Sequence, residues 1–168
     1  MIRCVNALVS LINVGFLGVF QVKNSPRVIE CKSQLLQAAL SRCRLIDLLK
    51  LGEDLLGKPI VLSTENHLVW YASADIPENS IMPQTGGRII SIHDYELNLN
   101  IDANFMSLDN PTSFYDETEG YFYSLYAIRN GENIRGYSCA MSVDEFSDDD
   151  LAIQKAFCAV LGNEMGKQ

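Results

Sequence analysis

Apolar residues recur at steps of three and four positions along residues 26–56, which is the spacing of an amphipathic helix. Ser25 suits the N-cap position and Pro26 suits the first helical position, so the helix is predicted to begin here. The apolar stripe of such a helix can cover a sheet or pair with a second copy of itself. We therefore expect a helical lead-in with one buried side.

A glycine and a proline mark the end of this helical run. Gly57 predicts a C-cap, and Pro59 prevents the helix from continuing. The run fits one long helix or two shorter ones, and a break near Arg44 or near Gly52 would suit the second alternative. In both cases the helical structure is expected to stop before residue 59.

From residue 59 onward the apolar pattern becomes that of strands. Residues 60–64 and 68–73 are short runs rich in strand-forming residues, and the three residues between them predict a hairpin. Residues 74–120 are less regular; one strand is expected near residues 88–92, and loops are predicted at Pro77, Pro83, Gly86-Gly87 and Asn110-Pro111. A connection of this length in a compact domain is usually functional or contains further elements.

A second hairpin is predicted from residues 121–129 and 134–143, with Asn130-Gly131 as the turn signal. The two faces of its second strand differ in character. The more apolar face is expected to face the core, and the small-residue face is expected to admit a helix or another sheet. The apolar face carries Tyr137, Cys139, Met141 and Val143, and the other carries Gly136, Ser138, Ala140 and Ser142.

Ser147 followed by three aspartates predicts the N-terminus of a last helix. Its apolar side carries Ile153, Phe157, Val160, Leu161 and Met165. The order helix, hairpin, long middle segment, hairpin, helix describes an α+β fold, in which an antiparallel β-sheet is flanked by N- and C-terminal helices.

The N-terminal segment, residues 1–25, has a different character. Residues 4–22 carry no charge, and their length is close to the roughly 20 residues that span a bilayer. Arg3 before them also fits a signal peptide. However, Asn6, Ser10 and Asn13 fall in one sector of a helix, as on a buried helix with a polar seam. We predict a buried helix or a helix and strand, with a membrane or signal segment as the alternative.

Two stretches resemble the opening and the close of a GAF/PAS-like sensory domain. The opening is Leu55-Leu56-Gly57-Lys58-Pro59 with the hairpin after it, and the close is the strand through residues 136–141 with the helix start at residues 146–151. The opening is similar to the sensory regions of PucR/CdaR-type bacterial transcription regulators. This resemblance, over residues 26–166, implies a GAF/PAS-like sheet and a sensory domain at residues 26–168. Such regulators place a helix-turn-helix region after this domain, and the chain ends before one.

The charge is negative and unevenly distributed. The formal net charge is −8, with a balance of +4 in residues 1–58 and −12 in residues 59–168. Because the acidic part would repel a phosphate backbone, we expect no direct nucleic-acid contact by this chain. The expected partners are a small-molecule metabolite and a second copy of the chain, bound through residues 26–56.

The five cysteines and two histidines suggest neither a disulfide framework nor a metal site. The cysteine count is odd and no C-x-x-C pair is present, so reduced, buried thiols in a cytoplasmic protein are expected. No metal-ligand spacing is found, and no cofactor is expected.

Seven residues are candidates for a ligand site between the sheet and the middle segment. Trp70, Tyr121 and Tyr123 could stack on a flat ligand, or they could simply pack in the core. Arg88 and Arg129 could bind an anionic group, or they could pair with acidic neighbours at the surface.

The other two candidates are His93, beside Asp94, and Cys139. A surface histidine and a buried structural thiol are the alternative interpretations, because no nucleophile–base arrangement or basic cluster accompanies them. No catalytic residues are assigned, and an enzyme is not expected. We predict a small-molecule-sensing regulatory domain of a transcription-regulator-type protein. The alternative is a dimerisation or protein-interaction module without a ligand, in which side chains fill the cavity.

Overall fold

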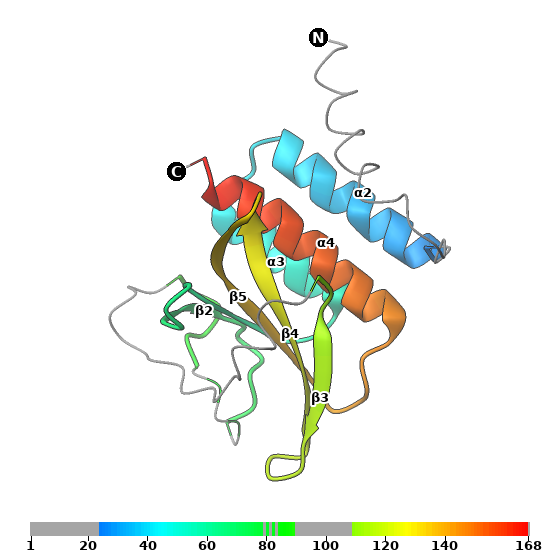
Figure 1. Cartoon of the computed structure of the whole chain (residues 1–168), viewed down its shortest axis with the longest axis vertical. Coiled ribbons are helices and arrows are strands. Elements are labelled where there is room, and N and C mark those ends of the chain that lie inside the picture. Colours follow the sequence, from blue (N-terminus) through cyan, green and yellow to red (C-terminus); the bar gives the residue numbers. More distant parts are fainter. Residues whose placement is uncertain (1–23, 79, 81, 83, 90–108, 168) are drawn as a thin grey trace.

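The computed structural model describes residues 24–78, 80, 82, 84–89 and 109–167. In chain order these form α2 (Pro26–Leu40), α3 (Leu45–Leu56), β1 (Ile60–Ser63), β2 (Val69–Ala72), β3 (Thr112–Asp116), β4 (Tyr121–Asn130), β5 (Asn133–Ser142) and α4 (Asp148–Met165). The predicted α+β class is confirmed (Figure 1). The expectations for residues 1–23 and for His93 lie outside the described residues.

The strands form a single antiparallel sheet in the order β2-β1-β5-β4-β3. The two predicted hairpins are therefore neighbours, joined through β1 and β5, where Val61 pairs with Cys139. The β4–β5 hairpin turns at Gly131, which has a φ of 61° as the Asn-Gly signal requires. β3 pairs with β4 and was not predicted from the sequence. Arg88 and Ile89, the described part of the strand predicted near residues 88–92, are not in a strand.

The helix boundaries follow from local capping. The Ser25 hydroxyl accepts a hydrogen bond from the Val28 amide at 3.2 Å, as expected of an N-cap. The break between α2 and α3 falls at Arg44 rather than at Gly52, which lies inside α3. Gly57 has a φ of 67° and closes α3 as its C-cap. Short-range hydrogen bonds thus cap the start of α2 and the end of α3, whereas the Arg44 side chain makes no capping hydrogen bond.

The helices cover one face of the sheet. α4 packs on β4 and β5, and α2 packs on the outer side of α4 (Figure 1). Ser138 and Ala140 of β5 lie on this face, so the prediction that the small-residue side admits a helix is confirmed. The core between the helices and the sheet has at its centre Leu35, Leu48, Leu49, Ile60, Leu62, Ile128, Ile153, Phe157 and Leu161.

The opposite face of the sheet has a second, smaller core. The sheet contributes Val61, Val69, Ala72, Tyr123, Leu125, Cys139 and Met141, and the segment after β2 contributes Ile76 and Met82. Cys139 and Met141 are thus buried as expected, whereas Val143, beyond the end of β5, is 71% exposed. Part of the irregular middle segment therefore covers this second face.

Candidate functional site

The segment after β2, of which residues 73–78, 80, 82 and 84–89 are described, is fixed to the edge of the sheet by Thr85. The buried Thr85 hydroxyl accepts a hydrogen bond from the Ala72 amide at 2.9 Å and donates one to the Ala72 carbonyl at 2.8 Å. The Gly87 amide donates to the same carbonyl at 2.9 Å. These bonds satisfy the Ala72 amide and carbonyl groups, which would otherwise lack hydrogen-bond partners at the edge of the sheet.

A second contact holds this segment over the sheet. The Ser80 hydroxyl lies 3.6 Å from the Met141 sulfur, and it accepts a hydrogen bond from the Met82 amide at 3.0 Å. Close to Ser80, the Tyr123 hydroxyl donates a hydrogen bond to the carboxylate of Glu119. Burial and this hydrogen bond raise the pKa of Tyr123, so the phenol stays neutral and acts as a donor.

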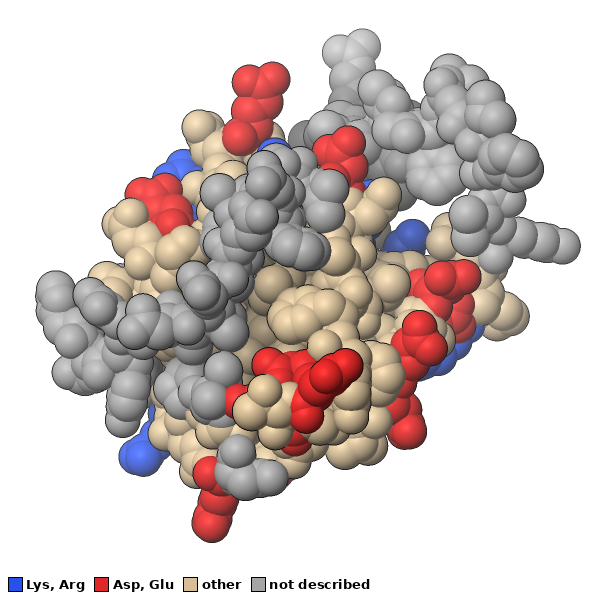
Figure 2. Space-filling model, turned by 60° about the horizontal axis from the view of Figure 1, so that its bottom comes forward, with Lys and Arg blue, Asp and Glu red and all other residues tan. Residues whose placement is uncertain are grey.

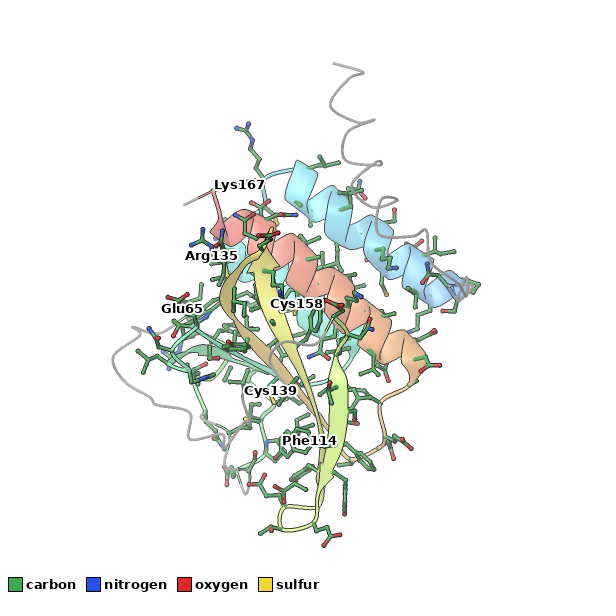
Figure 3. The ribbon with its side chains drawn as sticks, in the orientation of Figure 1. Glu65, Phe114, Arg135, Cys139, Cys158 and Lys167 are labelled. Carbon is green, nitrogen blue, oxygen red and sulfur yellow. The ribbon has the colours of Figure 1, made fainter. Side chains whose placement is uncertain are left out.

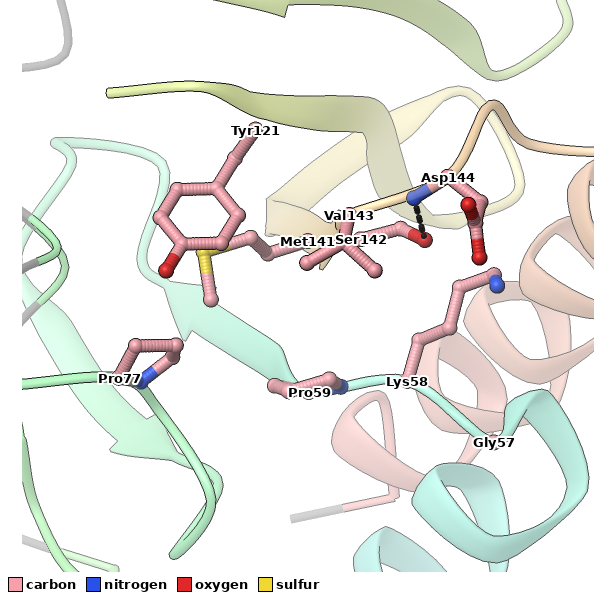
Figure 4. A pocket seen from close by; sticks show the side chains of 9 residues that line it. All are labelled: Gly57, Lys58, Pro59, Pro77, Tyr121, Met141, Ser142, Val143 and Asp144. Atoms are coloured by element: carbon pink, nitrogen blue, oxygen red, sulfur yellow. Dashed lines mark hydrogen bonds between the residues drawn. The ribbon is translucent and has the colours of Figure 1, made fainter.

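A hollow of about 270 Å³ opens where this segment meets the ends of the strands. It lies between the residues that follow α3, the loop at Pro77 and the open end of the β4–β5 hairpin, away from the turn at Gly131 (Figure 4). Its volume is just below that of most small-molecule pockets. The lining residues are Gly57, Lys58, Pro59, Pro77, Tyr121, Met141, Ser142, Val143 and Asp144.

The lining of this pocket combines an apolar surface with a few polar groups. Met141 and the two prolines form much of the wall, and Tyr121, Ser142, Lys58 and Asp144 supply the polar atoms. The Ser142 hydroxyl accepts a hydrogen bond from the Asp144 amide at 3.1 Å, which fixes the turn after β5. Such a mixture is typical of sites that bind small organic molecules.

Lys58 connects the pocket to the ends of two helices. Its ammonium nitrogen lies 3.7 Å from the carboxylate of Asp150, in the first turn of α4. The same carboxylate accepts hydrogen bonds from Arg27 of α2 at 2.9 Å and from the Ser147 amide at 3.1 Å. Burial alone would raise the pKa of Asp150, but the Ser147 and Arg27 hydrogen bonds, with the charge of Lys58, together hold it below its usual value.

The structure brings three of the seven predicted site residues to the second face of the sheet. Tyr121 lines the pocket, and Tyr123 and Cys139 lie in the small core. Trp70 instead belongs to the core on the helix side.

The two predicted arginines lie away from the pocket. Arg88 is exposed on the segment after β2. Tyr121 begins β4, and Arg129 lies near the other end of the same strand. There the Arg129 backbone lies close to Gly162 of α4. Neither borders the pocket, and His93 lies outside the described residues.

Sequence reasoning missed the polar pocket residues Lys58, Ser142 and Asp144. Lys58 lies in the Leu-Leu-Gly-Lys-Pro stretch that resembles the opening of a sensory domain, but nothing in that stretch marks its side chain as a ligand contact. Ser142 and Asp144 stand at an ordinary strand end. Only the tertiary structure brings the three together.

The buried thiols do not offer nucleophiles. Cys158 of α4 lies in the core on the helix side and Cys139 of β5 lies in the smaller core; both are labelled in Figure 3. Burial raises the pKa of both, and that of Cys158 reaches about 12 despite a hydrogen bond from Ser138. Both therefore remain protonated at neutral pH and behave as small apolar side chains.

The described part of the chain contains neither a metal-binding cluster nor a membrane-spanning helix. No three His, Cys, Asp or Glu side chains gather there in an arrangement that could hold a metal ion. None of the helices found there has the length and apolar character needed to cross a membrane.

Comparison with known proteins finds no matching family model and no similar curated protein. The relationship to GAF/PAS-like domains and to PucR/CdaR-type regulators therefore stays a prediction from the residues that suggested it.

Proposed function

We propose that the chain is a small-molecule-sensing regulatory domain of a transcription-regulator-type protein. The observation that carries this proposal is the pocket between the Pro77 loop and the strand ends. One wall is formed by Pro77, in the segment after β2, and the others are formed by the α3–β1 connection, the ends of β4 and β5, and the turn after β5. A ligand bound there would favour one arrangement of that segment over others.

The position of the pocket suggests how binding could be transmitted. Gly57 is the C-cap of α3, and residues 142–144 lead directly to Ser147, the N-cap of α4. A ligand in the pocket would therefore contact the connections to both helices. Because α2 packs on α4, a shift at these connections would reach the outermost helix, which is the predicted dimer surface.

The chemistry of the surface is consistent with a small-molecule partner rather than a nucleic acid. Acidic side chains predominate over basic ones on the face drawn in Figure 2, and residues 59–168 carry a balance of −12. Such a surface repels phosphate backbones. The four cysteines of the described residues are unpaired, which supports the cytoplasm as the proposed compartment.

A thermal-shift panel of purines, amino acids and small organic acids tests this function. A compound present at 100 times its Kd stabilises the folded state by roughly 2.7 kcal/mol, which corresponds to a rise in Tm of roughly 5–10 °C for a domain of this size. The proposal expects at least one compound to produce such a rise. It is contradicted if no compound in the panel changes the Tm.

The second candidate function is a dimerisation or interaction module that binds no ligand. It is favoured by the outer side of α2, where Ile29 and Leu40 are 58% and 67% exposed. These apolar side chains lie on the helix surface that does not face α4. A stable dimer that responds to no compound in the panel would support this second function.

A further inference from the structure

Lys58 is a cation whose hydrogen-bonding capacity is not used within the described part of the chain. Its ammonium nitrogen is 3.7 Å from the Asp150 carboxylate, and it lies 5.5 Å from the centroid of the Phe146 ring. Neither contact is a hydrogen bond, and no described residue accepts one from this nitrogen. An ammonium group has three donors, so Lys58 can still bind an acceptor in the pocket.

The negative charge of Asp150, the ion-pair partner of Lys58, is also stabilised by other groups. The Asp150 carboxylate accepts hydrogen bonds from Arg27 and from the Ser147 amide, and it lies at the N-terminal end of α4. The guanidinium charge and the helix end both stabilise a carboxylate at this position. Lys58 therefore forms an ion pair with Asp150 but still has N–H donors that no described residue uses, and these can bind a second anion.

Asp144, the second charged group of the pocket, influences the charge of the preferred ligand less than Lys58 does. The Lys58 side chain is only 19% exposed, whereas Asp144 is an exposed residue. A charge pair in a partly buried, low-dielectric position interacts more strongly than one surrounded by water. Exposed carboxylates beyond about 8 Å are in addition largely screened at physiological ionic strength. The partly buried Lys58 therefore favours a carboxylate at this end of the pocket, against a weaker repulsion from the exposed Asp144, which lines the same pocket.

We propose that this pocket binds a small monocarboxylate with an apolar body, its carboxylate on Lys58 and its body against Met141, Pro59 and Pro77. This inference rests on the proposed sensing function and adds the chemical class of the ligand. The cavity volume of about 270 Å³ limits the ligand to a small molecule, such as one with a single ring or a short chain.

The test is an NMR titration of the ¹⁵N-labelled full chain with phenylacetate, phenylacetamide and phenethylamine. The three probes share a phenyl group and differ in the charge of the polar end. We expect phenylacetate to shift the amide signals of Lys58, Tyr121 and Val143 in a saturable way. We expect phenylacetamide and phenethylamine to bind at least tenfold more weakly.

Failure of this inference is distinguishable from failure of the sensing function. Equal or tighter pocket binding by the amide or the amine would overturn the carboxylate class and leave a ligand site in place. If none of the three probes shifts the pocket signals, the inference is also overturned, and the thermal-shift panel decides separately whether the domain senses another ligand.

Matched variants identify the cation responsible. Lys58→Gln should weaken phenylacetate binding at least tenfold, and Lys58→Arg should restore most of the affinity because it retains the charge. Lys50→Gln, on the exposed side of α3, is the control and should leave the affinity unchanged. Unchanged affinity in Lys58→Gln would overturn the proposal. If that variant does not fold, the comparison of the three probes on the native chain still decides.

Discussion

The side-chain amide of Gln154, near the middle of α4, is hydrogen-bonded to Ser124 on β4. The Ser124 hydroxyl lies 2.5 Å from the amide oxygen, and the amide nitrogen donates to the Ser124 carbonyl at 3.0 Å. Both residues are fully buried. This polar contact within an otherwise apolar interface fixes the position of α4 along the sheet, because a shifted helix would leave both residues without partners.

Replacement of Gln154 by Leu should lower the free energy of unfolding by about 2–3 kcal/mol. The new side chain is apolar and of similar size, but it leaves the Ser124 hydroxyl buried without its partner. Urea unfolding followed by circular dichroism measures the change. Gln37→Leu, on the exposed side of α2, is the control and should change stability by less than about 0.5 kcal/mol. Equal effects of the two substitutions would show that the buried contact contributes nothing.

Gly162→Ala should destabilise the fold although alanine is the better helix former. A Cβ atom at this position in α4 would overlap the carbonyl oxygen of Arg129 in β4. Because that oxygen belongs to the backbone of the sheet, the helix itself must move, and we expect a loss of about 3 kcal/mol. A Tm at or above that of the native chain would contradict the close approach of α4 to β4.

Gly52→Ala provides a milder case of the same kind. Here a Cβ atom in α3 would overlap the ring of Phe157, a buried core side chain that can move only by displacing its neighbours, but the backbone of the sheet is not involved. The gain in helix propensity offsets part of the strain, so we expect a net loss of about 2 kcal/mol. The Tm of Gly162→Ala should therefore be lower than that of Gly52→Ala. The reverse order would contradict the packing of these two helices.

Much of the fold could be predicted from the sequence because its signals are local. Ser25 and Ser147 act through hydrogen bonds to amides three residues away, and Gly131 acts through its own backbone angle. Such interactions depend on neighbouring residues and can be recognised without knowing the tertiary structure. The helix starts and the second hairpin were accordingly predicted correctly.

The remaining features depend on contacts between distant segments. β3 is an edge strand whose Phe114 and Tyr115 are partly exposed, so it lacks the alternation of a half-buried strand. Alternation along β5 predicted two different faces, but it could not show which one the helices cover. The pocket is built from four separate parts of the chain, so no single stretch contains its pattern.

Asp150→Asn should lower stability at neutral pH and have little effect in acid. The pKa of Asp150 is held below its usual value in the fold, so its charge stabilises the folded state above the unfolded pKa near 4. This contribution is lost as the pH falls through the lower pKa of the folded state. At pH 7 we expect a difference of about 2 kcal/mol from the native chain.

Urea titrations at several pH values between 3 and 7 measure this difference. The difference in unfolding free energy between the native chain and Asp150→Asn should be constant between pH 5 and 7 and should become smaller below about pH 4. Asp148→Asn, at the exposed first position of α4, is the control and lacks the pairing with Arg27. A difference between native chain and Asp150→Asn that does not change with pH would contradict the ionised state assigned to Asp150.

The proposed homodimer should become a monomer when both Ile29 and Leu40 are replaced by Lys. These exposed apolar side chains lie on the outer side of α2, and charges there would oppose burial against a second copy. Sedimentation velocity at micromolar concentration measures the oligomeric state. The native chain should sediment as a dimer, and Ile89→Lys, which also replaces an exposed apolar residue, should sediment in the same way. A double variant that still dimerises would exclude this surface as the interface.

The central claim is that a small molecule binds in the pocket between the Pro77 loop and the strand ends. Val143 lies on its rim and is largely exposed, so Val143→Trp should fill the hollow without disturbing the core. The most direct measurement is the Tm shift caused by the best compound of the panel in this variant, with Ile29→Trp as the matched control. We predict that the shift is lost in Val143→Trp and kept in Ile29→Trp. Equal shifts in both variants, or no shift in the native chain, would contradict the claim.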